Sequence, residues 1–193
     1  EGQLSRTPEG IFTVNADARD LAAVSLSPFD KGFIRYGIKE FRAEEQPTVL
    51  SQINGVLKDS GVLVVADMVA PEGTKDWLNE HHRQKQRFEH RNIERDGECH
   101  IPTQEEWMTL LENAGFEASV DAMYTSRVTT TQWAGKAGQI SDAQRMEMDR
   151  LLLQAPDLAK STFNIREEDG LVKVDYPVII IRAVKSTVLL NNE

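Results

Sequence analysis

Polar and aromatic side chains follow two strand-like runs of this chain, where they could bind or orient a small ligand. Arg35 and Tyr36 come directly after residues 29–34, and Asp67 comes directly after residues 62–66. Ligands of open α/β sheets bind outside the carboxyl ends of the strands, which favours a binding site here. The alternatives are a surface ion pair and a packing aromatic for Arg35 and Tyr36, and a loop cap for Asp67. The sequence leaves both interpretations open.

Three further polar residues are candidates for a site. Asp17 follows the short apolar run of residues 11–14, where it could accept hydrogen bonds from a ligand or only shape a turn with Asn15. Lys39 and Glu40 lie further along the chain. A Lys–Glu pair removes protons poorly at neutral pH unless its pKa values are shifted, so we expect no catalysis from this pair.

Four histidines and one cysteine raise the question of a metal site, namely His81, His82, His90, His100 and Cys99. Their spacing matches no closed tetrahedral ligand set. A solvated, charged helix accounts for the first three histidines. We therefore predict no metal.

Composition narrows the class of protein. The chain has 193 residues, 40% of them hydrophobic and 27% charged, which suits a single domain over residues 1–193. A net charge of -9 argues against nucleic acid as a partner, because binding to the phosphate backbone needs clustered Lys and Arg.

A cytoplasmic protein without a membrane span is expected. Cys99 is the only cysteine, so no internal disulfide can form and nothing indicates an oxidising compartment. No run approaches the roughly 18–20 apolar residues of a membrane helix, and the N-terminus lacks the basic-then-apolar order of a signal peptide. Because the chain opens on Glu1 rather than Met, we expect it to be part of a longer or processed protein.

Hydrophobic patterning predicts alternating strands and helices. Strands are expected at residues 11–14, 29–34 and 62–66, the last continuously apolar as in a parallel sheet covered on both faces. Between the second and third strands, apolar positions recur at helical spacing and mark a helix that begins near Glu45 and ends at Gly61. A strand, a helix and a strand in this order imply a right-handed crossover.

The second half of the chain alternates in the same way, with a capping box at the start of two of its helices. We expect helices at 74–92, 103–115 and from 141 with a break at Pro156, and strands at 116–128, 171–174 and 178–184. Residues 129–169 exceed what a hairpin needs and are expected to form a helical insertion. Within it Trp133, Met146 and Met148 could line a lid over a site, or belong to an amphipathic helix packed on the sheet edge.

Several short motifs follow one another in a fixed order. They are Ala16-Asp17-Ala18 with Leu21, Phe29-Asp30, Ile38-Lys39-Glu40-Phe41, Val56-Leu57-Lys58-Asp59-Ser60-Gly61 and Asp67. This order resembles the class I S-adenosylmethionine-dependent methyltransferases of small molecules. In that family the third strand ends in G-D-A-x-x-L, the fourth reads F-D-x-V before a loop ending in L-H-H-F, and the next helix and strand read V-L-K-P-G-G-x-L-x-I-x-D. Residues 101–116 and 177–184 resemble the family's late helix and final antiparallel strand.

The resemblance implies an α/β fold, a Rossmann-like three-layer sandwich whose mostly parallel sheet ends in an antiparallel strand. It also implies S-adenosyl-L-methionine as the cofactor. Asp17 would accept a hydrogen bond from the adenine amino group, and the backbone N–H of Ala18 would address the neighbouring ring nitrogen. Arg35 and Tyr36 would border the methionine part of the cofactor and the methyl acceptor.

The resemblance also bears on the acceptor side. Relatives often carry two histidines at the positions of Lys39 and Glu40, and insertions such as residues 129–169 cover their acceptor pocket. We therefore assign Lys39, Glu40, Asp67 and Trp133 to the substrate.

Two features of the family have no counterpart in the sequence. Both the glycine-rich turn after the first strand and the acidic residue that ends the second strand would precede Glu1. In the family's strand order, 3-2-1-4-5-7-6, residues 11–14 would lack their usual neighbours, and an unpaired buried strand is costly. Either the N-terminal strands belong to a longer gene product, or this strand pairs differently, for example with a second copy in a homodimer.

We predict methyl transfer from S-adenosylmethionine to a small-molecule acceptor. The first alternative is a truncated or degenerate methyltransferase-like module without catalysis, which acts through self-association or partner binding. A nicotinamide-dependent dehydrogenase is a third interpretation, but the chain lacks the glycine fingerprint and an evident acid–base pair.

Overall fold

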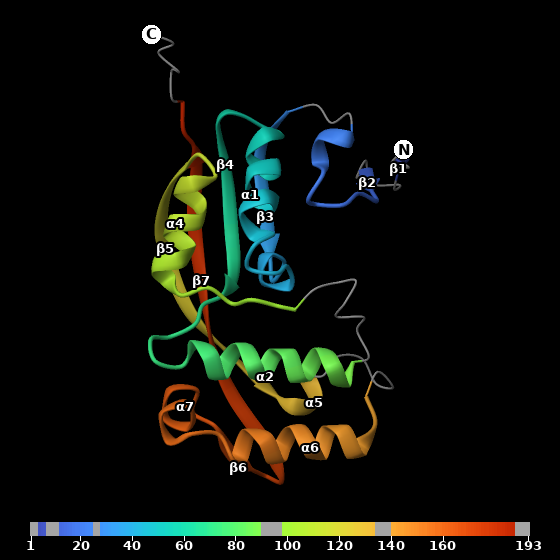
Figure 1. Ribbon diagram of the computed structural model, residues 1–193, viewed down its shortest axis with the longest axis vertical. Helices are drawn as coiled ribbons and strands as arrows, with labels where there is room; N and C mark the ends of the chain where they lie inside the picture. The colour runs from blue at the N-terminus through green and yellow to red at the C-terminus, as the bar shows by residue number, and fades with distance from the viewer. Residues whose placement is uncertain (1–3, 7–11, 25–27, 90–97, 134–139, 188–193) are drawn as a thin grey trace.

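A mixed β-sheet forms the centre of the molecule (Figure 1). The computed structural model describes residues 4–6, 12–24, 28–89, 98–133 and 140–187. The sheet has the order β3-β4-β7-β5, with β6 beside β7. Its strands are β3 (Phe29–Arg35), β4 (Leu57–Met68), β5 (Phe116–Thr129), β6 (Arg166–Glu168) and β7 (Leu171–Lys185). Since β3 is parallel to β4, and β7 is antiparallel to both β4 and β5, the three strands β3, β4 and β5 share one direction.

Helix α1 (Gln46–Gly55) connects β3 to β4 and begins close to the predicted Glu45, with Pro47 in its first turn. The predicted end of this helix at Gly61 is wrong, because β4 begins at Leu57. Register against β3 jumps from Phe29↔Leu57 to Lys31↔Val62, so residues 58–61 form a bulge. A Cβ atom on Gly61 would lie 2.7 Å from the Lys58 carbonyl oxygen, so the tight bulge and not a helix cap requires glycine here.

Helix α4 (Gln104–Asn113) packs with α1 on one face of the sheet (Figure 1). Its predicted capping box is confirmed: the Glu106 N–H donates to the Thr103 hydroxyl, and the Thr103 N–H donates to the Glu106 carboxylate. Trp107 and Leu111 of this helix are fully buried. The Trp107 indole N–H also donates to the Met68 carbonyl at 3.0 Å, which ties the helix to the end of β4.

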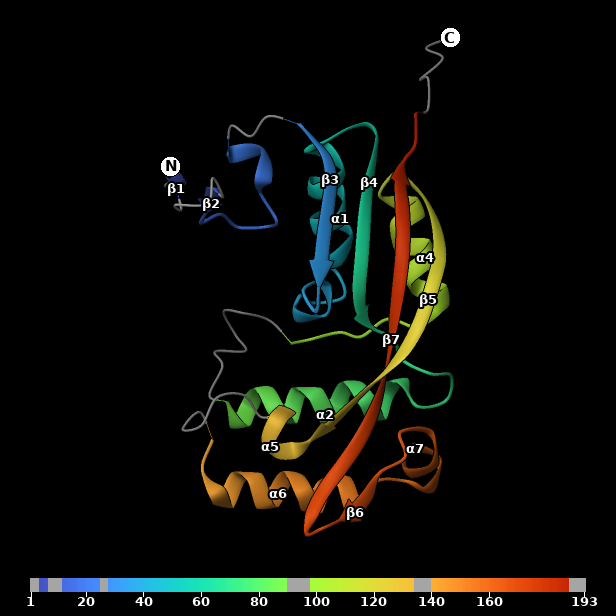
Figure 2. The same cartoon turned by 180° about the vertical axis from the view of Figure 1, so that it is seen from behind.

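The opposite face of the sheet is open where β3, β4 and β7 lie side by side, because no helix of the described residues covers it (Figure 2). Phe29 and Phe33 of the edge strand β3 are 46% and 66% exposed, and strand alternation places both on this face, because Ile34 packs against the core on the other. The described chain thus forms two layers in this part of the sheet, and the three-layer sandwich stays a prediction.

A group of helices lies at the carboxyl end of β4, beside the parts of β5 and β7 that extend beyond it (Figure 1). They are α2 (Lys75–Phe88), α5 (Thr130–Trp133), α6 (Asp142–Leu153) and α7 (Asp157–Thr162). The last three belong to the segment predicted as an insertion, and the predicted capping box of Ser141 and Gln144 is present. In the ranges that the structure covers, every helix is too short or too polar to span a bilayer.

Strand β7 runs without interruption through Pro177, so the predicted break at residues 175–177 is wrong. Met68 is the last residue of β4 to pair with β7, opposite Val178. The Pro177 carbonyl accepts a hydrogen bond of 3.2 Å from the Val69 N–H. Because the N–H and C=O of one strand residue point to the same side, the N–H that Pro177 lacks faces the side where β4 has ended. The missing N–H leaves Val69 and Pro177 with one hydrogen bond where a regular antiparallel pair has two, so pairing with β4 ends here. Strand β7 continues because β5 still pairs with it on the other side, with Thr125 opposite Pro177.

The N-terminal strand β2 (Phe12–Val14) is not part of the main sheet. It pairs antiparallel with β1 (Leu4–Arg6) of the same chain. Both expectations for its other neighbours, further N-terminal strands or a second copy in a homodimer, stay predictions. Ile11 lies outside the described residues, as do His90 and the predicted end of α2 near Asn92.

Candidate functional site

A cavity of about 350 Å³ lies at the carboxyl ends of β3 and β4. Four of the predicted site residues line it although they come from three separate segments, namely Arg35, Tyr36, Lys39 and Trp133. The sequence did not predict three other lining residues, His82, Lys85 and Tyr176. Met68, Ser126, Val128 and Gln132 complete the wall.

Tyr36 turns the chain into the cavity directly after β3. Its φ of 51° is in the left-handed region, which is uncommon for a bulky residue and marks local backbone strain. Its N–H donates to the Ala66 carbonyl at 3.0 Å, and its hydroxyl lies 3.3 Å from that of Tyr124 on β5. The Arg35 guanidinium lies 5.0 Å from the Tyr36 ring centre, a cation–π contact. The strained turn therefore places a cation and a ring together at the cavity.

Asp67 lies beneath the cavity and holds the short helix η2 (Ile38–Glu40) against β4. One carboxylate oxygen accepts the N–H groups of Ile38 and Lys39 at 3.1 and 3.4 Å, and the other accepts the Met68 N–H at 2.8 Å. Burial raises the pKa of Asp67 to about 6, although Lys39 and the three N–H donors act in the opposite direction. Asp67 does not line the cavity, so its geometry is that of a positioning group and its contact with a substrate stays a prediction.

Lys39 and Glu40, predicted from the sequence as a pair, form an ion pair within η2. Lys39 is buried and lines the cavity, whereas Glu40 does not line it. The buried Gln46 side chain donates to the carbonyls of Ile38, Phe41 and His100, which fastens the segment that carries Lys39.

Aromatic rings from α2, α5 and β7 form one wall. The Trp133 ring stacks on His81 with centres 4.7 Å apart and meets His82 edge-on at 4.9 Å. Its centre lies 5.6 Å from that of Tyr176, whose hydroxyl is 3.0 Å from His81 Nε2. Lys85 is 5.2 Å from the Trp133 ring centre. These contacts hold Trp133 in place as part of the cavity wall. The other two residues that could form a lid do not line the cavity: Met146 is 65% exposed, and Met148 is buried.

His82 is the functional candidate that the sequence interpretation missed. The charged pattern predicts a solvated helix face for it, but α2 lies between the main sheet and α6 (Figure 1), and His82 is buried. Burial places its pKa well below the usual value for histidine, so the ring is neutral. Its Nε2 atom has no hydrogen-bond partner among the described residues. The available signal was helical spacing, because His81 and His82 follow the buried Leu78 by three and four residues.

Asp17 and Ala18 lie in the loop between β2 and η1 (Leu21–Ala23) and do not line the cavity. Hydrogen bonds from Arg19 lower the pKa of Asp17 to about 2 and occupy both of its oxygens. Arg19 also pairs with Glu45 at 2.7 Å, next to the start of α1. The structure thus links Asp17 to the N-terminus of α1, and its role with adenine stays a prediction.

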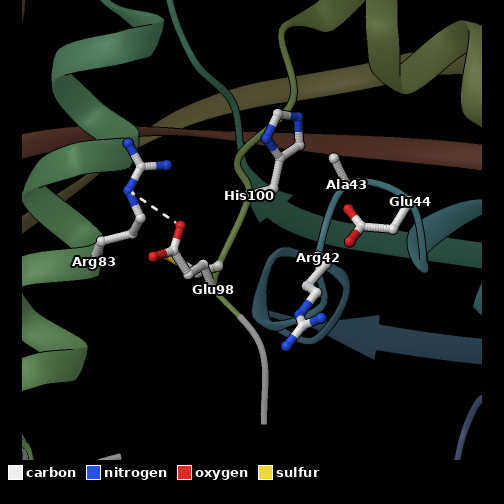
Figure 3. A pocket seen from close by; sticks show the side chains of 7 residues that line it. Arg42, Ala43, Glu44, Arg83, Glu98 and His100 are labelled. Atoms are coloured by element: carbon white, nitrogen blue, oxygen red, sulfur yellow. Dashed lines mark ion pairs between the residues drawn. The ribbon is translucent and has the colours of Figure 1, made fainter. Parts of the chain in front are cut away.

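A second cavity of about 460 Å³ lies between α2 and the segment that follows η2 (Figure 3). Its walls carry both signs of charge, and Arg83 and Glu98 form an ion pair of 3.7 Å there. None of the predicted binding residues lines it. No group of three His, Cys, Asp or Glu side chains that could hold a metal occurs in the part of the chain that the structure covers, and His90 lies outside that part.

Comparisons with known proteins establish the fold. No family profile and no curated protein sequence matches the chain. Among solved structures, it is similar to a candidate methyltransferase of Bacillus halodurans C-125, with a TM-score of 0.74 and 20% identity over 91% of this chain and 78% of that one. It is also similar to the YcgJ protein of Bacillus subtilis, with a TM-score of 0.72 and 18% identity over 88% and 69% of the two chains. The chain therefore has the class I methyltransferase fold that its motifs predicted.

Proposed function

We propose that this chain, with its class I methyltransferase fold, transfers a methyl group from S-adenosylmethionine to a small-molecule acceptor held in the cavity at the ends of β3 and β4. The observation that carries the proposal is the convergence of Arg35, Tyr36, Lys39 and Trp133 on that cavity. Its volume of about 350 Å³ lies in the range of small-molecule sites.

Residues from two segments of the chain would hold the cofactor. Arg35 and Tyr36 would border both its methionine part and the methyl acceptor, and Asp17 and Ala18 would hold its adenine. Asp17 fits this role in part: its side chain is 48% exposed, but an adenine amino group would have to replace one of the hydrogen bonds from Arg19. When bound, the cofactor supplies a methyl group that its sulfonium already activates.

The residues of the chain then have to orient the acceptor, exclude water and favour the acceptor's reactive form. Tyr36, Trp133 and Tyr176 provide flat apolar surfaces that restrict its orientation. No carboxylate of the described residues lines the cavity, and burial makes His82 a weak base. Arg35, Lys39 and Lys85 would favour the ionised form of an acceptor hydroxyl by lowering its pKa.

The same proposal includes the finer fold expectation, a Rossmann-like three-layer sandwich. Two features of the described part of the chain support it, namely the free edge of β3 and the open sheet face that carries Phe29 and Phe33. Further strands would pair with that edge, and helices of a third layer would cover that face.

Calorimetry with S-adenosylmethionine and S-adenosylhomocysteine tests the cofactor step on the whole chain. We expect saturable binding, weakened about fivefold to tenfold by Asp17→Asn, because the substitution removes a charged acceptor. Asp30→Asn is the matched control, since Asp30 is an exposed carboxylate paired with Lys58 at 2.8 Å and lines none of the cavities described above. Absence of binding at millimolar ligand would contradict the proposed function for this chain.

A further inference from the structure

We infer that the acceptor is a small aromatic carboxylate that carries a hydroxyl or amino group on the ring. The inference rests on the proposed function, because it names the substrate class of the same cavity. Three features of the cavity support it: the sign of its charges, the rings in its walls and one buried nitrogen without a partner among the described residues.

The charged side chains that line the cavity are all cations. Arg35, Lys39 and Lys85 line it, and no Asp or Glu of the described ranges does. This contrasts with the chain as a whole, whose net charge is -9. A positive cavity in an acidic protein attracts anions and disfavours cationic ligands.

The three cations differ in how far they are already neutralised. Lys39 is paired with Glu40, and Lys85 is paired with Glu89 at 2.7 Å. Arg35 has no carboxylate within 4.0 Å among the residues that the structure covers. Its planar guanidinium matches a carboxylate through two parallel hydrogen bonds, which an ammonium group does not. Arg35 is therefore the residue best suited to hold an incoming carboxylate, with Lys85 as a second positive charge.

The walls favour a flat ring between the charged groups. Tyr36, His82, Trp133 and Tyr176 all present rings to the cavity, and Met68 and Val128 add apolar surface. The rings are fixed by their own contacts, since Trp133 stacks on His81 and lies against both His82 and Tyr176. Aromatic pairs prefer offset or edge-on arrangements at these separations, so an aromatic ligand gains contacts that a flexible aliphatic acid does not.

His82 supplies the third feature. It is buried, its ring borders the cavity, and its Nε2 atom has no partner among the described residues. A buried polar atom without a hydrogen bond is costly, and a hydroxyl or amino group entering beside the ring would remove that cost. A neutral imidazole has one donor and one acceptor nitrogen, so either group can bond to it.

The test is calorimetric binding of 4-hydroxybenzoate to the whole chain without cofactor. We expect it to bind at least about tenfold more tightly than the neutral isostere 4-hydroxybenzamide, and 4-hydroxybenzylamine to bind most weakly. Arg35→Gln and Lys85→Gln should each remove most of the preference for the acid. Arg182→Gln is the matched control, because Arg182 is an exposed arginine of β7 that does not line the cavity.

Equal binding of the acid and the amide, or equal effects of Arg35→Gln and Arg182→Gln together with no effect of Lys85→Gln, would overturn the inference. Circular dichroism of each variant shows whether a loss of binding reflects unfolding. The assay contains no cofactor, so it separates the two proposals. If the chain prefers the acid but does not bind S-adenosylmethionine, the ligand class is supported and methyl transfer is contradicted. If the chain binds S-adenosylmethionine but does not prefer the acid, only the ligand class is contradicted.

Discussion

The Nε2 atom of His81 lies 3.0 Å from the hydroxyl oxygen of Tyr176, and both side chains are buried. The bond joins α2 to β7 across 95 residues of sequence. Burial lowers the pKa of His81 to about 3 and raises that of Tyr176 well above its usual value, so the two partners are neutral over the physiological range. This neutral pair supports the aromatic wall of the cavity, because Trp133 stacks on His81.

Tyr176→Phe should lower the free energy of unfolding by about 1–3 kcal/mol, because it leaves a buried imidazole nitrogen without a partner. Urea unfolding followed by circular dichroism measures the change. Tyr124→Phe removes the same group from a side chain that is 40% exposed and should change stability by about 0.5 kcal/mol or less. Equal effects of the two substitutions would show that the His81 bond contributes nothing specific.

His81→Gln should make stability less sensitive to acid. The pKa of His81 is about 3 in the folded protein and near 6.5 when unfolded, so the unfolded state binds more protons between these values. The wild-type protein should therefore lose roughly 1–1.5 kcal/mol relative to His81→Gln when the pH falls from about 7.5 to 5.5. Urea unfolding at the two pH values measures this difference. Parallel pH dependence in both proteins would contradict the burial of a neutral His81.

Asp67→Asn should destabilise the protein by about 1–3 kcal/mol at neutral pH. Both carboxylate oxygens accept backbone N–H groups, so an amide in either orientation turns its own N–H₂ toward at least one donor. The pH dependence has the opposite sign to that of His81. The folded protein binds the proton more tightly, because burial raises the pKa of Asp67 to about 6, so the wild type should gain about 1 kcal/mol over the variant between about pH 7.5 and 5.5. A constant difference in unfolding free energy would show that Asp67 has an ordinary pKa.

Gly61→Ala should destabilise the protein by about 1–3 kcal/mol, because the new Cβ would lie 2.7 Å from the Lys58 carbonyl oxygen inside the bulge of β4. Gly55→Ala is the matched control, since Gly55 is the last residue of α1 and a methyl group added there would have open space within 4 Å among the described residues. That substitution should be neutral or should stabilise by up to about 1 kcal/mol. Thermal unfolding of both variants compares them, and similar losses would argue against the bulge.

Trp133→Ala should lower kcat/KM for the acceptor by about tenfold or more while leaving cofactor affinity unchanged, because Trp133 belongs to the cavity wall and to none of the proposed cofactor contacts. Met146→Ala is the control from the same insertion, since Met146 is 65% exposed and should have no effect on either quantity. Steady-state kinetics and calorimetry measure the two quantities separately. A loss confined to cofactor binding would remove Trp133 from the acceptor site.

Features decided by a few neighbouring residues were predictable. The capping boxes of Thr103 and Ser141 are present because each depends on hydrogen bonds within four residues. Strand β3 and the strand after α1 were predicted from local apolar patterning. The prediction at Gly61 was wrong because its need for glycine comes from a bulge against β3. The prediction at Pro177 was wrong because β5 pairs with β7 on the side opposite β4 and carries the strand past the proline.

The sequence by itself determined the order of strands and helices, the strand-end positions of Arg35 and Tyr36, and the motifs that resemble methyltransferases. Only the tertiary structure decided which of these residues share a cavity. His82 and Tyr176 joined Arg35 and Trp133 there, whereas Asp17 and Asp67 did not. The physical reason is that hydrogen bonding and hydrophobic spacing act over a few residues, while a cavity forms where segments far apart in the chain pack together, and that packing also decides which polar atoms are buried without a partner.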